Sequence, residues 1–330
     1  MKRISLPLLA VGTLVLTSCS LTLWDYSNIA SKRFALVYGV AMYESGVSPG
    51  PGKAPNLSFP SDDASSMATM LTAEGYTVVS RWVDINGNVY VDGQPKSALP
   101  TLTDAPTKAT ITTDLSDMAG LVGPDDVFVF YFSGHGMQDV SVSPPVEYFV
   151  PEGAVSGAGG SEPLSISDAE FGSLLAPIAS KRKVVILDTC NSGGFIGNTL
   201  EADAIPAVSL GSFGSISLQA LAQALDNFLS FSTSTPALSP YGGAMVLSAS
   251  GRDESCYETP TWGHGVMTYF LIQARQSGDL NHDGHVTVGE AFSLAKAGIE
   301  TDWNTAPYVQ SHAEQFEPRV SGGPVDFVLW

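Results

Sequence analysis

The sequence predicts an α/β fold with a mostly parallel central sheet flanked by helices. Two continuous apolar runs of strand-forming residues, at 127–132 and 184–187, have the pattern of strands buried on both faces, as in a parallel sheet. Helical spacing of apolar residues occurs between the predicted strands, for example at 64–71. The chain has 330 residues and is 44% apolar, which is enough for one large core.

Local signals set the boundaries of several elements. The polar trio at 61–63 predicts an N-cap and an acidic first turn for the first helix, which Gly75 ends. Asn-Gly at 86–87 and Asp-Gly at 92–93 are turn dipeptides, so we expect a hairpin within 84–106. The predicted strands are at 33–43, 76–83, 127–132, 184–187 and 244–249, with the hairpin after the second and a final edge strand at 324–330. The predicted helices follow 61–63 and lie at 107–122, 165–175, within 216–229, at 266–276 and at 289–299.

Both long apolar runs lead to residues that can do chemistry. His135 lies between two glycines after the first run, and Cys190 follows the second. Ligands of open α/β sheets bind beyond the carboxyl ends of the strands, so neighbouring parallel strands would bring both residues to one edge. An adjacent imidazole lowers the pKa of a thiol and makes it a nucleophile. The pair therefore predicts a Cys–His dyad, although a lone cysteine would more simply be structural.

Two motifs resemble those of the caspase-like cysteine peptidases, closest to the metacaspase and bacterial caspase-like branch. They are YFSGHG at 131–136 and LDTCNSGG at 187–194, and the resemblance extends over 32–330. The active-site pentapeptide of true caspases is absent, since the chain has DTCNS around Cys190. The resemblance implies a caspase-like sandwich and cysteine endopeptidase activity.

The resemblance also implies individual roles. The sulfur of Cys190 would attack the scissile carbonyl, and His135 would take the thiol proton and protonate the leaving amine. The amides of Gly136 and Cys190 would bind the oxyanion. Asp188 and Asp63 would line the S1 pocket, where two carboxylates favour a Lys or Arg side chain at P1. Capping of the first helix alone also accounts for Asp63.

The charge balance limits the partners. The chain has 33 acidic and 15 basic residues, a formal net charge of −18. This balance argues against nucleic acid as a partner, because phosphate binding needs a basic face. An acidic protein is compatible with a secreted domain and with protein or peptide substrates that are basic. Three cysteines are too few for a disulfide-rich scaffold.

The first 18 residues have the charge order and length of a secretory signal peptide. Basic residues at 2–3 precede an apolar stretch at 4–16, which is too short to span a membrane. The sequence LTSC at 16–19 resembles a bacterial lipobox, which implies cleavage before Cys19 and diacylglycerol on its sulfur.

Residues 19–31 would then form a lipidated tether. Ser20 rather than Asp follows the lipobox cysteine, which favours the outer membrane in the enterobacterial sorting pattern. We therefore expect a lipid-anchored protein of the bacterial cell envelope, either periplasmic or surface-exposed.

Residues 279–290, DLNHDGHVTVGE, fit the EF-hand calcium loop at every position. Gly284 would make the sharp turn, and helices are expected on both sides. We predict that the loop binds Ca²⁺; the alternative is a helix–loop–helix turn without metal. The predicted ligands are Asp279, Asn281, Asp283, the backbone carbonyl of His285, Thr287 acting through water, and Glu290 with both oxygens.

The caspase-like resemblance divides 32–330 into a large part at 32–195, a connecting segment at 196–243 and a small part at 244–330. The small part contains Cys256, which we expect to be a passive packed residue, with a disulfide to Cys190 in an oxidising envelope as the alternative. His264 is expected to be structural and not a second base.

Two other functions stay open at this stage. One is a catalytically silent, calcium-binding caspase-fold scaffold in the envelope. The other is a different Cys–His hydrolase or acyltransferase, because a fold does not fix its chemistry.

Overall fold

The computed structural model describes residues 31–43, 56–96, 104–139, 141–143, 146–153, 164–190, 243–251, 254–321 and 326–330, with the isolated positions 217, 219, 220, 223 and 224. The predicted signal peptide, Cys19 and nearly all of the connecting segment lie outside these residues. The elements below belong to the unit Ser31–Trp330.

An eight-stranded sheet forms the middle layer, in the order β13-β10-β9-β5-β1-β2-β3-β4. The five central strands from β10 to β2 pair in parallel, as predicted, whereas β3, β4 and β13 are antiparallel to their neighbours. The strands are β1 Arg33–Val40, β2 Thr77–Val83, β3 Val89–Val91, β4 Gln94–Pro95, β5 Val127–Ser133, β9 Arg182–Asp188, β10 Met245–Ser248 and β13 Arg319–Ser321.

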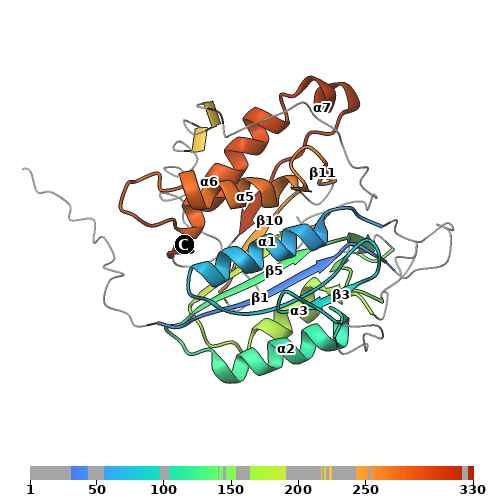
Figure 1. Ribbon diagram of the computed structural model, residues 1–330, viewed down its shortest axis with the longest axis vertical. Helices are drawn as coiled ribbons and strands as arrows, with labels where there is room; N and C mark the ends of the chain where they lie inside the picture. The colour runs from blue at the N-terminus through green and yellow to red at the C-terminus, as the bar shows by residue number, and fades with distance from the viewer. Residues whose placement is uncertain are drawn as a thin grey trace, which may run out of the picture. The chain divides into compact units, whose positions relative to one another are not determined.

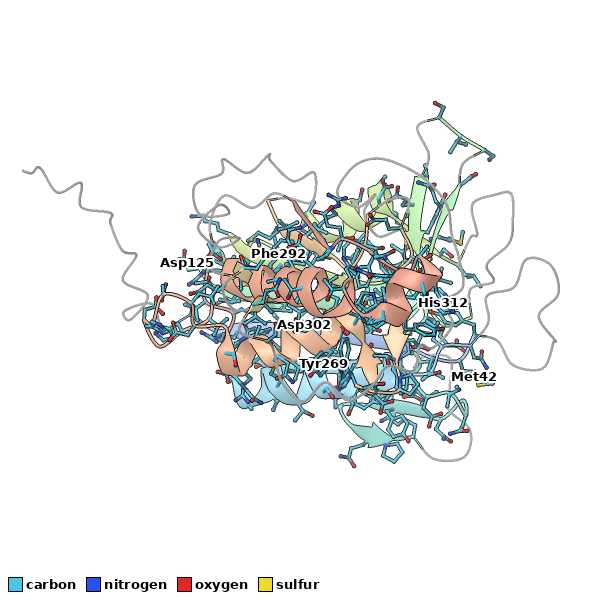
Figure 2. All side chains as sticks on the ribbon, turned by 90° about the horizontal axis from the view of Figure 1, so that it is seen from above. Met42, Asp125, Tyr269, Phe292, Asp302 and His312 are labelled. Atoms are coloured by element: carbon cyan, nitrogen blue, oxygen red, sulfur yellow. The ribbon has the colours of Figure 1, made fainter. Side chains whose placement is uncertain are left out.

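Helices cover both faces of this sheet (Figure 1). The helices α1, α5 and α6 lie on one side, and α2 and α3 lie on the other. Tyr269 of α5 and Phe292 of α6 lie along two helices that pack against each other (Figure 2). The helices are α1 Pro60–Ala73, α2 Lys108–Leu121, α3 Asp168–Leu175, α5 Val266–Ser277, α6 Val288–Gly298, the π-helical turn η3 Ile299–Trp303 and α7 Pro307–His312.

Two small sheets lie outside the main one. Three strands follow the His135 loop, and a two-residue hairpin precedes α5. They are β6 Gly136–Asp139, β7 Val146–Phe149 and β8 Ile166–Ser167, and β11 Glu258–Thr259 with β12 His264–Gly265.

The buried strands separate two cores. In β5, Phe128, Phe130 and Phe132 face the core shared with α2 and α3, whereas Val129 and Tyr131 face the core shared with α1, α5 and α6. This alternation follows from the period of two in a strand. Burial on both faces explains why β5 and β9 are apolar without interruption.

The expected N-cap of the first helix is wrong. The cap position is Phe59, it makes no side-chain cap hydrogen bond, and Pro60 occupies the first turn. Proline suits this position because its missing N–H would have no helical partner there. The trio 61–63 therefore lies inside the helix, which leaves the carboxylate of Asp63 available for contacts beyond it.

The expected edge strand at 324–330 is also wrong. The edge of the main sheet is β13, which pairs antiparallel with β10. The C-terminal residues instead pair with the loop before α6, where the amide of Val286 donates to the Trp330 carbonyl and the amide of Leu329 donates to the Val286 carbonyl. The apolar tail thus serves as a backbone partner for that loop.

No helix within the described parts of the chain has the length and apolar character to cross a bilayer.

Candidate active site

The site lies beyond the carboxyl ends of β5 and β9. These strands are parallel neighbours, and their last residues, Ser133 and Asp188, are register partners. Alternation along each strand turns both side chains toward the α1 and α5 side of the sheet. The chain continues from these two positions into His135 and Cys190, so both lie at one edge of the sheet, as the sequence predicts.

The two loops contact each other through their backbones. The amide of Gly134 donates to the Asp188 carbonyl at 3.3 Å. A β carbon at Gly136 would overlap the carbonyl oxygen of Cys190, so position 136 requires glycine for this approach. His135 is 3% exposed and Cys190 is fully buried.

Tyr43 holds the His135 loop from the side of β1. Its hydroxyl accepts a hydrogen bond from the His135 amide at 2.6 Å, and the two rings are 4.6 Å apart. Burial raises the pKa of Tyr43 well above its usual value, so the hydroxyl stays protonated. Sequence reasoning assigned Tyr43 only to a strand, because nothing local marks this contact.

Asp63 is the most heavily bonded carboxylate of the neighbouring pocket. It accepts hydrogen bonds from the Ser133 hydroxyl at 2.9 Å and from the Gly265 amide, and it is paired with His264 at 2.9 Å. Only 1% of its surface is exposed. Its interactions with β5 and β12 explain its position better than helix capping does.

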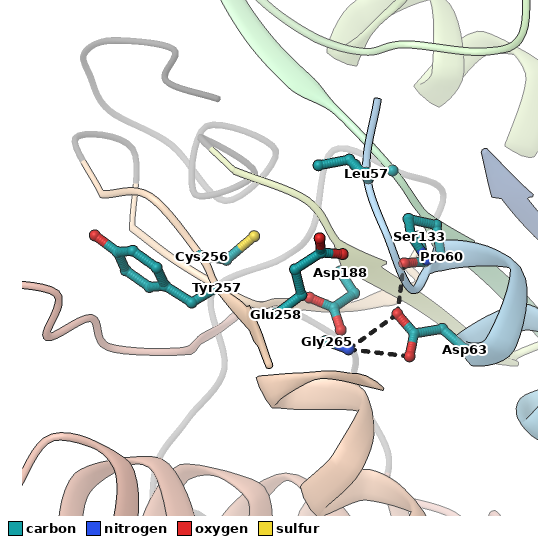
Figure 3. A pocket seen from close by; sticks show the side chains of 10 residues that line it. Leu57, Pro60, Asp63, Ser133, Asp188, Cys256, Tyr257, Glu258 and Gly265 are labelled. Atoms are coloured by element: carbon teal, nitrogen blue, oxygen red, sulfur yellow. Dashed lines mark hydrogen bonds between the residues drawn. The ribbon is translucent and has the colours of Figure 1, made fainter. Parts of the chain in front are cut away.

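Asp188 faces Asp63 across Gly265 (Figure 3). A β carbon at Gly265 would lie 2.5 Å from Asp188 Oδ2 and 3.0 Å from Asp63 Oδ2, so glycine permits the close approach. The amide and hydroxyl of Thr268 both donate to Asp188 Oδ2. Burial, followed by the charge of Asp63, raises the pKa of Asp188 to about 7.

Glu258 is a third carboxylate of this pocket, and sequence reasoning did not assign it a role. It lines the pocket together with Asp63 and Asp188. Its two oxygens accept from the amides of Ser58 and Phe59 at 2.8 and 3.0 Å. Burial raises the pKa of Glu258, although these hydrogen bonds oppose the shift. The signal in the sequence was its place in residues 250–258, which resemble a turn that lines the substrate cleft in caspase-like peptidases.

His264 is paired with Asp63 at the edge of this acidic group. Burial alone lowers its pKa, but the hydrogen bond and the negative charge of Asp63 outweigh that effect and raise it. Its side chain remains 19% exposed. His264 is thus a direct side-chain partner of Asp63.

Cys256 lies directly beside the candidate nucleophile. Its sulfur is 3.6 Å from the sulfur of Cys190, and both thiols are free. Cys256 is 3% exposed and lines the same pocket as Asp188. Burial, followed by the contact with Cys190, raises the pKa of Cys256 well above its usual value.

The predicted calcium loop joins α5 to α6 as expected, on a different part of the surface. Gly284 has a φ of +89° at the sharp turn. Both oxygens of Asp279 turn inward and accept from the amides of Asp283 and Gly284. Asn281 Oδ1 accepts from the Asp283 amide, and Asp283 Oδ1 accepts from the His285 amide.

The last predicted ligand, Glu290, is fully buried and already hydrogen-bonded. It forms a capping box with Thr287, and its other oxygen accepts from the amides of Leu280 and Asn281. Across the described residues, no three His, Cys, Asp or Glu side chains are grouped so as to hold a metal ion. The oxygen donors suit Ca²⁺ chemically, but Glu290 would have to exchange its backbone partners for the ion.

Comparisons with known proteins give one similar structure and one family. The chain resembles a solved structure, protein GSU0716 from Geobacter sulfurreducens, at 15% identity with a TM-score of 0.49, over 88% of this chain and 92% of that one. No curated protein matches it. The model of the peptidase C14 family, described as the caspase domain, matches residues 32–312. The chain therefore belongs to the caspase-domain peptidase family.

Proposed function

We propose that this protein is a lipid-anchored cysteine endopeptidase that cleaves after Lys or Arg, with Cys190 as nucleophile and His135 as base. The observation that carries the proposal is the parallel pairing of β5 with β9, which brings both residues to one sheet edge beside a pocket lined by three carboxylates. Family membership supports the peptidase chemistry.

The proposed reaction uses groups at that edge. His135 accepts the thiol proton as the Cys190 sulfur attacks the scissile carbonyl, and it then protonates the departing amine. The amides of Gly136 and Cys190 would donate to the oxyanion, and the close packing of Gly136 on the Cys190 carbonyl supports their proximity. Water then hydrolyses the acyl-enzyme, and His135 acts as base again.

The acidic pocket supports a basic P1 side chain. Asp63, Asp188 and Glu258 converge on a pocket that contains no Lys or Arg among its lining residues. Two of them, Asp188 and Glu258, have raised pKa values because their charges are buried close to other carboxylates. A substrate cation would relieve this repulsion and favour the ionised form of both.

A labelling experiment tests the proposal. Lys- and Arg-chloromethyl ketones should alkylate Cys190 far faster than Cys256, and faster than the Ala- or Asp-based reagents do. A positional-scanning peptide library should then give cleavage after Lys and Arg. If both cysteines are labelled equally and no peptide is cleaved, the peptidase proposal is wrong, and a catalytically silent scaffold is the remaining function.

We also propose that loop 279–290 binds Ca²⁺. Its turn glycine and its inward-facing oxygens at Asp279, Asn281 and Asp283 support this, and pairing of Val286 with the C-terminal residues braces the loop. The side chain of Glu290 and the carbonyl of His285 would complete the oxygen shell. Whether the ion also governs activity is tested by assaying the peptidase in calcium and in chelator.

The anchor is proposed from the sequence of residues 1–19 alone. Membrane fractionation of cells that produce the full chain should place it in the envelope, with the outer membrane favoured. Cys19→Ser should release the protein or leave it unprocessed, and a fatty-acid label should be absent from that variant. An unchanged membrane fraction with no lipid label on the parent protein would remove the proposal.

A further inference from the structure

Two thiols from distant parts of the sequence meet at the candidate nucleophile. Besides the 3.6 Å contact between the sulfurs, Cys190 Sγ lies 3.8 Å from the backbone carbonyl of Cys256. Cys190 follows β9, and Cys256 lies in the segment before β11, so only tertiary structure joins them.

We propose that Cys190 and Cys256 form an oxidation site, at which a hydroperoxide converts the two thiols into a disulfide that removes the nucleophile. The loss of peptidase activity that follows rests on the proposed function, whereas formation of the disulfide does not.

The chemistry balances in two steps. The Cys190 thiolate attacks one oxygen of hydrogen peroxide, the O–O bond breaks, and the products are a sulfenic acid and hydroxide, which takes the thiol proton to become water. The Cys256 sulfur then attacks the Cys190 sulfur, an S–S bond forms, the S–O bond breaks, and hydroxide leaves with the Cys256 proton as water. The two thiols lose two electrons and the peroxide gains them.

The environments of the two sulfurs assign these roles. Burial raises the pKa of Cys256, so it remains a protonated thiol until it attacks. Cys190 lies against the His135 loop through its backbone, and the proposed function makes His135 the base that forms its thiolate. Cys190 is therefore the thiol that meets the oxidant, and Cys256 is the resolving thiol.

Distance and access fit the same scheme. A disulfide bond is about 2.0 Å long, so the sulfurs, now 3.6 Å apart, have to approach by about 1.5 Å to form it. Cys256 lines the pocket beside Gly134 and Asp188, and the buried Cys190 sulfur lies directly behind it, so a small peroxide would reach Cys190 past Cys256. The disulfide would also divert Cys190 from irreversible sulfinic and sulfonic acids.

The test uses the full chain carrying Cys19→Ser, in which Cys190 and Cys256 are the only cysteines left. The protein is exposed to hydrogen peroxide, its remaining thiols are alkylated, and its intact mass and peptide map are measured. We expect a loss of two hydrogens, a cross-linked peptide pair containing residues 190 and 256, and recovery of both thiols with dithiothreitol. A gain of oxygen atoms on Cys190 without any cross-link would overturn the proposal.

The matched variant adds Cys256→Ser. Its Cys190 should take up two or three oxygens that dithiothreitol does not remove, so activity lost to peroxide, measured relative to its own reduced form, should not return. Equal recovery in both proteins would contradict a resolving role for Cys256. The cross-link map of the parent protein decides the question even if the variant fails to fold.

The two proposals fail separately. A chain that forms the cross-link but cleaves no peptide when reduced would retain the oxidation site and lose the peptidase function. A chain that cleaves peptides but never forms the cross-link would do the reverse.

Discussion

The sheet-edge site and the loop at 279–290 are both clusters of oxygen-rich side chains, but they are built in opposite ways. The first gathers Asp63, His135, Asp188, Glu258 and His264 from five separate segments. The second takes all its polar groups from one stretch of twelve residues and closes them with local hydrogen bonds. The edge site therefore depends on the fold, whereas the loop depends mainly on its own sequence.

This difference has a consequence for charge. The carboxylates of the edge site are crowded by packing and are nearly excluded from water, so the pKa of Asp188 rises to about 7. Asp279 and Asp283 in the loop are more exposed and are satisfied by backbone amides. Mutations at the edge should therefore change activity, and mutations in the loop should change calcium-dependent stability.

The largest effect is expected at the base. His135→Ala should lower kcat/KM for a Lys or Arg peptide by roughly 10³-fold or more, because proton transfer and thiol activation are both lost. The matched control is His312→Ala, since His312 is exposed on α7 (Figure 2). Cleavage kinetics on the two purified variants measure the effect. Comparable rates for both would remove His135 from the mechanism.

The next effect concerns the pocket. Asp188→Asn keeps the shape but removes a charge, so KM for Arg peptides should rise by about 10- to 100-fold, as for the loss of one charged hydrogen bond. Peptides with a neutral P1 residue should change little. The exposed Asp125 gives the matched control Asp125→Asn (Figure 2). A uniform loss for all P1 residues would indicate damage to the fold and not lost charge recognition.

The loop provides a stability effect. If it binds Ca²⁺, a tenfold excess over Kd stabilises the folded state by about 1.4 kcal/mol. Glu290→Gln should abolish the resulting rise in melting temperature, whereas Glu300→Gln on the following turn, outside the loop, should keep it. Thermal unfolding in calcium and in chelator gives the comparison. If the parent protein has the same melting temperature in calcium and in chelator, the proposal that the loop binds Ca²⁺ is wrong.

The smallest effect is the dependence of stability on pH. The folded state holds the Asp188 proton up to about pH 7, whereas the unfolded chain releases it near 3.8. The folded state thus binds more protons in this window, so this group's contribution is fully present below pH 3.8 and is lost as the pH rises through about 7. Asp188→Asn should lessen that fall, and Asp125→Asn should not. If melting temperature depends on pH in the same way in the parent protein and in Asp188→Asn, the raised pKa of Asp188 does not cause the fall.

Substrate binding should show the opposite trend. Because a basic P1 side chain prefers the ionised carboxylate, KM for Arg peptides should fall as the pH rises toward and past 7, while KM for neutral peptides stays level. Steady-state kinetics with both kinds of peptide, measured across this pH range on the parent enzyme, give the two KM profiles.

Sequence reasoning and structure agree most closely where a signal is local. The apolar runs predicted β5 and β9, and their polar endings predicted that His135 and Cys190 would meet at one edge. The helices on both sides of the loop were also predicted, because helical periodicity is a property of a short window.

Sequence reasoning and structure differ where a residue can bond either to a partner nearby in the sequence or to one that is far away in it. An acidic residue at the start of a helix suits capping, yet Asp63 bonds to Ser133 and Gly265 instead. An apolar tail suits an edge strand, yet the last residues pair with Val286, and β13 takes the edge. Neither outcome can be read from spacing, since both depend on elements that are far away along the chain.

The sequence by itself determined the central strands, the helices that flank the loop at 279–290 and the placement of His135 and Cys190 at strand ends, because hydrophobic periodicity and turn chemistry act over a few neighbours. Only the tertiary structure decided that Glu258 joins two aspartates, that His264 pairs with Asp63, and that Cys256 lies against Cys190. The physical reason is that these contacts come from the register of parallel strands and the packing of α1 and α5 on them, which join residues with no local relation to one another.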